Sequence, residues 1–77
     1  MPDISSLKKF HDCCRTIVKN SDKKALNYCI NYAKYGLYLQ DREAARVQSL
    51  YILNNMIYWR GPEAKKVRSF LKEFSKS

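Results

Sequence analysis

The chain has 77 residues, and 15 Lys or Arg against 7 Asp or Glu give it a formal net charge of +8 at pH 7. This length allows at most one domain, and a 45% share of hydrophobic residues argues against an intrinsically disordered chain. Two glycines and two prolines are too few for the turns of a strand-rich sandwich or barrel, so the composition predicts an all-α fold.

Turn residues divide the chain into four predicted helices. Apolar residues recur at helical spacing in each stretch between the turns. The predicted helices span residues 5–19, 23–35, 41–60 and 62–75. Because the connections are only a few residues long, sequential helices are expected to lie in contact. The expected architecture is a single small helical bundle over residues 1–77.

Capping residues set the expected ends of these helices. Ser5 or Ser6 can accept a hydrogen bond from the first turn of the first helix, and Asp41 can do the same for the third. Gly36 is expected to end the second helix in a left-handed conformation. Pro62 suits the first turn of the last helix, where its missing N–H is not needed.

Helical wheels separate the terminal helices from the third one. The first and last helices have an apolar face opposite a row of basic residues, which is typical of the outside of a bundle. The third helix is apolar almost all round, so we expect it at the centre of the bundle or covered by a second subunit. Because the core of so short a chain is small, a homodimer remains an open alternative.

Tyrosines form a separate arc on the second helix. Tyr28, Tyr32 and Tyr35 recur at helical spacing, away from the aliphatic face of that helix. They either pack against another helix, with each hydroxyl bonded, or stand exposed as a contact surface. Trp59 and Arg60 form an aromatic and arginine pair of the kind enriched at binding hot spots. The alternative for Trp59 is to close the bundle where the third helix turns into the fourth.

Basic residues line one side of the last helix. This basic stripe consists of Lys65, Arg68, Lys72 and Lys76, and it could follow a phosphate backbone or meet an acidic surface. The alternative is an ordinary solvated face. Arg15 of the first helix extends the stripe if the first and last helices lie side by side.

No residue pattern favours catalysis or a cofactor. His11, Cys14 and Cys29 offer at most three zinc ligands, whereas a structural zinc site takes four. A nucleophilic Cys–His pair would also need an oxyanion hole, and two glycines cannot supply a Gly-rich loop for one or for phosphate. We therefore expect no catalytic residue, no metal and no cofactor.

Signals for export are also missing. No run approaches the roughly 18 apolar residues of a membrane span, and the first residues contain no apolar signal-peptide region. The three cysteines, two of them adjacent, make a poor disulfide framework and are typical of a reducing compartment. We expect a cytoplasmic protein with free thiols and no membrane partner.

The stretch from LNYCINYAKYGL to VQSLYILNNMIYWRGPEAKKVRSFLKEF resembles a group of small helical proteins of tailed bacteriophages. They share a YILNN-like helix, a YWRG-like turn and an AKxVRxxLK-like last helix, and the resemblance carries no established activity. It implies an accessory protein that binds and modulates a macromolecule inside a bacterial host. The expected partner is a host protein, bound through the residues Tyr28, Tyr32, Tyr35, Trp59 and Arg60. The alternative is nucleic acid, bound by the basic stripe and Arg15.

Overall fold

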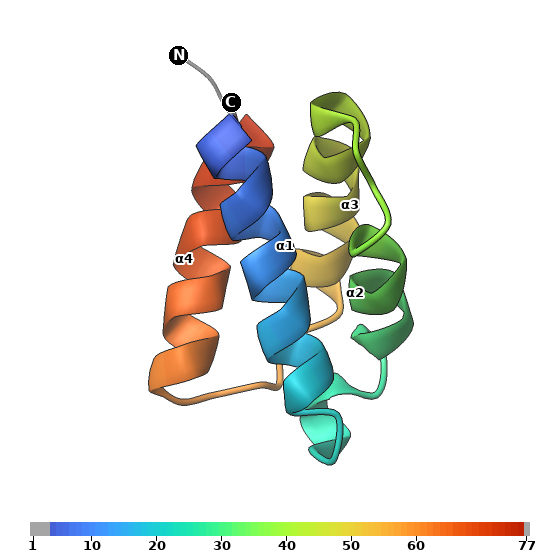
Figure 1. Cartoon of the computed structure of the whole chain (residues 1–77). Helices are drawn as coiled ribbons and strands as arrows, with labels where there is room; N and C mark the ends of the chain where they lie inside the picture. The colour runs from blue at the N-terminus through green and yellow to red at the C-terminus, as the bar shows by residue number, and fades with distance from the viewer. Residues whose placement is uncertain (1–3, 77) are drawn as a thin grey trace.

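The computed structural model describes residues 4–76, with side chains from residue 7 onward. Within that range the protein is all-α, as the composition predicted, with four α-helices, one 3-10 turn and no strand. The elements are α1 (Ile4–Lys19), η1 (Lys24–Leu26), α2 (Ile30–Gly36), α3 (Arg42–Asn54) and α4 (Pro62–Lys76) (Figure 1). The first and last helices therefore agree with their predicted ranges to within one residue at each end.

The second predicted helix is broken into two elements. The backbone at η1 forms i to i−3 hydrogen bonds, from the Leu26 N–H to Lys23 and from the Asn27 N–H to Lys24, and α2 begins only at Ile30. Neither η1 nor α2 has a side-chain cap at its start. With Asn27 in the stretch and no cap, local helix preference is weak, and the tighter 3-10 pattern satisfies the backbone instead.

The third helix ends at Asn54 rather than at residue 60. The side chain of Asn55 donates from Nδ2 to the Tyr51 carbonyl at 2.8 Å, a local bond that competes with helix continuation. The turn that follows brings Met56 and Trp59 into the core. Tertiary packing therefore decides where α3 stops, which helical periodicity alone does not reveal.

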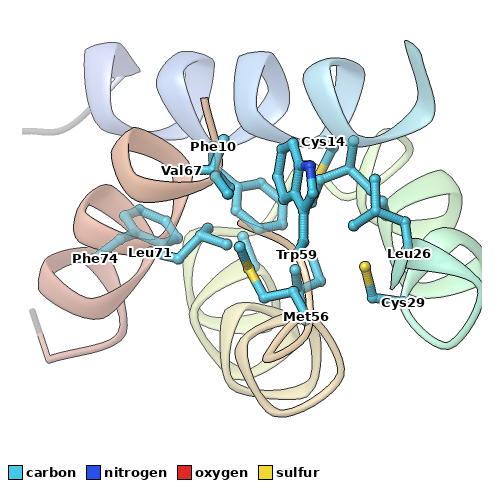
Figure 2. Packing of buried hydrophobic residues seen from close by; sticks show 14 residues of the cluster. Phe10, Cys14, Leu26, Cys29, Met56, Trp59, Val67, Leu71 and Phe74 are labelled. Carbon is cyan, nitrogen blue, oxygen red and sulfur yellow. The ribbon is translucent and has the colours of Figure 1, made fainter. Parts of the chain in front are cut away.

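The core lies between all four helices. Its buried apolar residues are Phe10, Cys14, Ile17, Leu26, Cys29, Ala33, Ala45, Ile52, Met56, Trp59, Ala64, Val67, Leu71 and Phe74. Figure 2 shows the Trp59 indole in the middle of this cluster, with Leu71 and Phe74 on one side and Leu26 and Cys29 on the other. Trp59 thus closes the bundle from within.

The helices form a ring in which α1 and α3 each contact the other three. α4 lies on the opposite side of the bundle from α2 (Figure 1). The expectation of a fully central third helix is wrong, because one face of α3 stays exposed. α1 is as central as α3, since it packs against α2, α3 and α4.

The two glycines have different roles, and the role of Gly36 differs from the predicted one. Gly61 has φ +115° and supplies the left-handed residue just before α4. Gly36 has no positive φ; it is buried, and a Cβ there would lie 2.7 Å from Cys14 Sγ. Gly36 therefore lets α1 and α2 approach closely, and the prediction of a left-handed stop is wrong.

Capping at the start of α3 is confirmed. Asp41 accepts a hydrogen bond at 3.1 Å from the Ala44 N–H. α1 begins at Ile4, so Ser5 and Ser6 lie inside its first turn, and their side chains are outside the described part. Among residues 4–76, no helix combines the length and the apolar character needed to cross a membrane.

Candidate interaction surface

The tyrosines of the α2 region are exposed to solvent. The exposed fraction is 71% for Tyr28, 59% for Tyr35 and 38% for Tyr32. The core positions of this segment are taken by Leu26, Cys29 and Ala33. The sequence left open whether these tyrosines are packed against another helix or exposed. The structure supports the second interpretation, in which the tyrosine arc is exposed.

α3 presents apolar side chains outward next to this arc. Val47, Leu50 and Tyr51 are each more than two-fifths exposed, although they share one arc of the helix. On the opposite arc, Gln48 and Ser49 are buried. Ala45 and Ile52 share that buried arc, so over these turns α3 has apolar side chains in water as well as in the bundle.

One hydrogen bond to α2 fixes this orientation of α3. Gln48 donates from Nε2 to the backbone carbonyl of Tyr32 at 2.9 Å, which ties α3 to α2. Ser49 donates from Oγ to the Ala45 carbonyl at 3.0 Å within its own helix. Both buried polar groups are satisfied, and rotating α3 to hide its aliphatic side chains would break the bond to α2.

The two exposed arcs join into one surface. The rings of Tyr32 and Tyr51 stack across the helix pair, with centroids 5.7 Å apart and planes 15° from parallel. Beyond α3, Ile57 and Tyr58 are also exposed. We call this surface the aromatic face; it consists of Tyr28, Tyr32, Tyr35, Val47, Leu50, Tyr51, Ile57 and Tyr58.

A pocket lies at one end of the aromatic face. It has a volume of about 280 Å³ and is lined by Tyr28, Asn54, Asn55, Ile57 and Tyr58. Two tyrosines and an isoleucine give it apolar walls, while the two asparagines add amide groups. It is open rather than enclosed, so it can receive a side chain from a docking partner.

Trp59 and Arg60 differ in what they can contact. Trp59 is 3% exposed, so its ring packs in the core and we leave it out of the candidate surface, which corrects the sequence-based assignment. Arg60 is exposed and lies two residues after Tyr58 in the chain. It therefore remains available at the edge of the aromatic face.

The basic stripe is less uniform than predicted. Lys65, Lys72 and Lys76 are exposed, but Arg68 donates from Nη2 to the carbonyl of Trp59 at 2.8 Å and to that of Met56 at 3.4 Å. Its guanidinium therefore closes the turn between α3 and α4. A stripe that lacks its arginine is a weaker ligand for phosphates, because guanidinium is the better bidentate donor.

α1 and α4 do pack side by side, the condition under which Arg15 could extend the stripe. Arg15 is paired instead with Asp12, with Nη1 2.6 Å from Oδ1. The groove between the two helices, about 290 Å³, is lined by Asp12, Cys13, Thr16, Glu63, Lys66 and Val67. Carboxylates thus interrupt the basic surface where the two helices meet.

The histidine and the thiols serve packing. His11 donates from Nε2 to the Leu39 carbonyl at 2.7 Å, which holds α1 to the loop before α3. Burial raises the pKa of Cys14 to about 12 and that of Cys29 to about 11, and burial with the nearby Asp12 raises that of Cys13 to about 11. Thiols protonated at neutral pH are poor nucleophiles. Within residues 4–76, no three His, Cys, Asp or Glu side chains are grouped to hold a metal ion.

Sequence reasoning missed part of the aromatic face. Val47, Leu50 and Tyr51 were read as buried or covered, although the polar pair Gln48 and Ser49 on the opposite arc was a usable signal. No protein-family model, curated protein or solved structure matches this chain. The proposed function therefore depends on the geometry of the surface itself.

Proposed function

We propose that this chain is a non-enzymatic interaction protein that binds another protein through the aromatic face. The observation that carries the proposal is the outward position of Val47, Leu50 and Tyr51 on α3, a helix that already buries Ala45 and Ile52 in the core. Such an arrangement is unfavourable in water and becomes favourable when another protein covers it.

The size of the aromatic face supports protein binding. From the exposed fractions of its side chains and ordinary side-chain areas, it presents on the order of 1,000 Å² of accessible surface. This area counts tyrosine hydroxyls and backbone atoms as well as carbon, so only its apolar part compares with the roughly 300–600 Å² of the largest apolar patch on a typical monomer. One partner of a stable protein complex contributes about 800 Å². The aromatic face thus matches an interface better than an ordinary surface.

Its composition points the same way. All eight residues of the face are uncharged, and five of them are tyrosines. Two exposed cations lie close to them in the chain, Lys34 between Tyr32 and Tyr35 on α2 and Arg60 two residues after Tyr58. Interface centres are enriched in aromatic residues and depleted of charge, and Tyr is frequent at hot spots. Tyrosine also loses little conformational entropy on binding, because only two side-chain torsions are fixed.

The proposed partner is a protein of a bacterial host. This assignment depends on the resemblance of the α2 to α4 stretch to small phage proteins of no established activity, which implies an accessory role inside a bacterial host. Nucleic acid is the second candidate, with the exposed Lys65, Lys72 and Lys76 as its support. It is less favoured, because Arg68 and Arg15 are committed to other groups and the tyrosines lie on a different surface from the lysines.

The test is an affinity pull-down from bacterial lysate, with half of each sample treated with nuclease. The baits are the wild-type chain, Leu50→Glu in the aromatic face, and Ser69→Glu, which adds the same charge at an exposed position of α4. We expect a host protein that survives nuclease with wild type and Ser69→Glu and disappears with Leu50→Glu. Recovery of nucleic acid alone, lost on nuclease treatment and unaffected by Leu50→Glu, would favour the second candidate.

A further inference from the structure

The aromatic face has the character of a surface that is covered for most of the protein's life. In the α3 segment, Gln48 and Ser49 share the buried arc with Ala45 and Ile52, while Leu50 and Val47 remain in water. Transient interfaces are about as polar as the rest of a protein surface, whereas permanent ones resemble a core cut in half. The chain has a small core, and covering this face would extend it.

Charge separates the aromatic face from the rest of the molecule. Seven of the ten exposed lysines lie on α1 and α4, whereas Lys23 and Lys24 lie at η1 and Lys34 lies on α2; the seven are Lys8, Lys9, Lys19, Lys65, Lys66, Lys72 and Lys76. α4 lies across the bundle from α2 (Figure 1). A negatively charged partner would bind to α1 and α4. The occupant of the uncharged face is therefore recognised by the shape of its apolar surface and by hydrogen bonds with the tyrosine hydroxyls.

We propose that a second copy of this chain covers the aromatic face in the resting protein, forming a two-fold symmetric dimer. This inference rests on the proposed function, because both use the aromatic face as the contact surface. A second copy is present whenever the chain is made, and two-fold dimers are the commonest soluble oligomers. Each copy contributes on the order of 1,000 Å², so the area is sufficient for a stable dimer.

The two-fold arrangement keeps like charges apart. When two uncharged faces meet, the lysines of α1 and α4 remain toward solvent on both copies, and salt weakens the repulsion between the two net charges of +8. Tyrosine hydroxyls act as both donors and acceptors, so a face rich in tyrosine can pair with itself. A host protein that binds the same face must displace the second copy.

The test is sedimentation equilibrium of the full chain from about 1 µM to about 100 µM, which spans the affinities expected for an interface of this size. We expect a particle of twice the 9.1 kDa chain mass. Leu50→Glu should raise the dissociation constant at least about 100-fold, because symmetry buries the added charge twice. Ser69→Glu should leave the constant within a few-fold of wild type.

Ile57→Glu provides a second variant of the aromatic face, at a position outside the helices. Circular dichroism of each variant tests whether it is folded. A wild-type chain that remains monomeric at the highest concentration overturns the inference, as does a dimer unaffected by both Leu50→Glu and Ile57→Glu. If a monomeric chain still captures a host protein that Leu50→Glu loses, the proposed function stands without the dimer. If it captures none, both fail.

Discussion

Arg68 supplies hydrogen bonds that the backbone needs after α3 has ended. Its guanidinium reaches the Trp59 and Met56 carbonyls, while its neighbours Lys65 and Lys72 on the same helix are exposed. Spacing along α4 groups these three residues into one stripe. Only the position of the turn after Asn54 shows that one of them has a structural role.

Replacing Arg68 with Met should therefore destabilise the fold. We expect the free energy of unfolding to fall by about 1.5–3 kcal/mol, because hydrogen bonds to a charged donor are lost from a partly buried turn. Lys72→Met is the matched control and should change stability by less than about 0.5 kcal/mol. Urea unfolding followed by circular dichroism measures both, and equal effects of the two substitutions would contradict the assigned role.

Exposure of the tyrosines is a residue-scale property that sequence reasoning left open. The separation of Tyr28, Tyr32 and Tyr35 from the aliphatic arc was visible in the helical spacing. Whether another helix covers that arc depends on where α3 lies, and α3 is positioned by the bond from Gln48 to the Tyr32 backbone. That contact joins residues far apart in sequence, and no local pattern encodes it.

At the scale of elements, the local signals at Asp41 and Pro62 were read correctly, whereas the local signal at Gly36 and the features set by tertiary packing were not. Asp41 caps α3 and Pro62 begins α4 as predicted, because both act within one turn of chain. The break before α2 and the end of α3 at Asn54 were missed. The break before α2 and the end of α3 both depend on which side chains pack in the core. Trp59 is buried there because the chain turns after α3 ends.

The close approach of α1 and α2 at Gly36 gives a test with an unusual sign. Gly→Ala inside a helix ordinarily stabilises by about 0.5–1 kcal/mol. Here the new Cβ would lie 2.7 Å from Cys14 Sγ and 3.1 Å from Phe10 Cζ, so Gly36→Ala should instead destabilise by about 1–3 kcal/mol.

The double variant Gly36→Ala with Cys14→Ala isolates the clash. Removing the sulfur gives the new methyl group room, so the double variant should be more stable than the sum of the two single effects predicts. Thermal and urea unfolding of the four proteins in this cycle provide the measurement. Additive effects would mean that Sγ is not the obstacle and that the Phe10 ring limits the approach.

The whole molecule has two chemically distinct sides. The α2–α3 side presents the uncharged aromatic face, and the α1 and α4 side carries most of the exposed lysines. The excess positive charge and the amphipathic terminal helices predicted the basic side. The apolar side could not be placed from the sequence, because a helix apolar all round is equally consistent with a central position and with a covered surface.

If a second copy covers the aromatic face, stability must depend on protein concentration. Folding is then coupled to association, so each tenfold rise in concentration should raise Tm by about 3–5 °C for chains of this length. Leu50→Glu should abolish this dependence and unfold at a constant, lower Tm, because the charge at this exposed position blocks association and not the fold of one chain. Ser69→Glu should retain the wild-type slope. Differential scanning calorimetry over a hundredfold concentration range gives the slope for each protein, and a wild-type Tm independent of concentration would show that the aromatic face is open in the isolated chain.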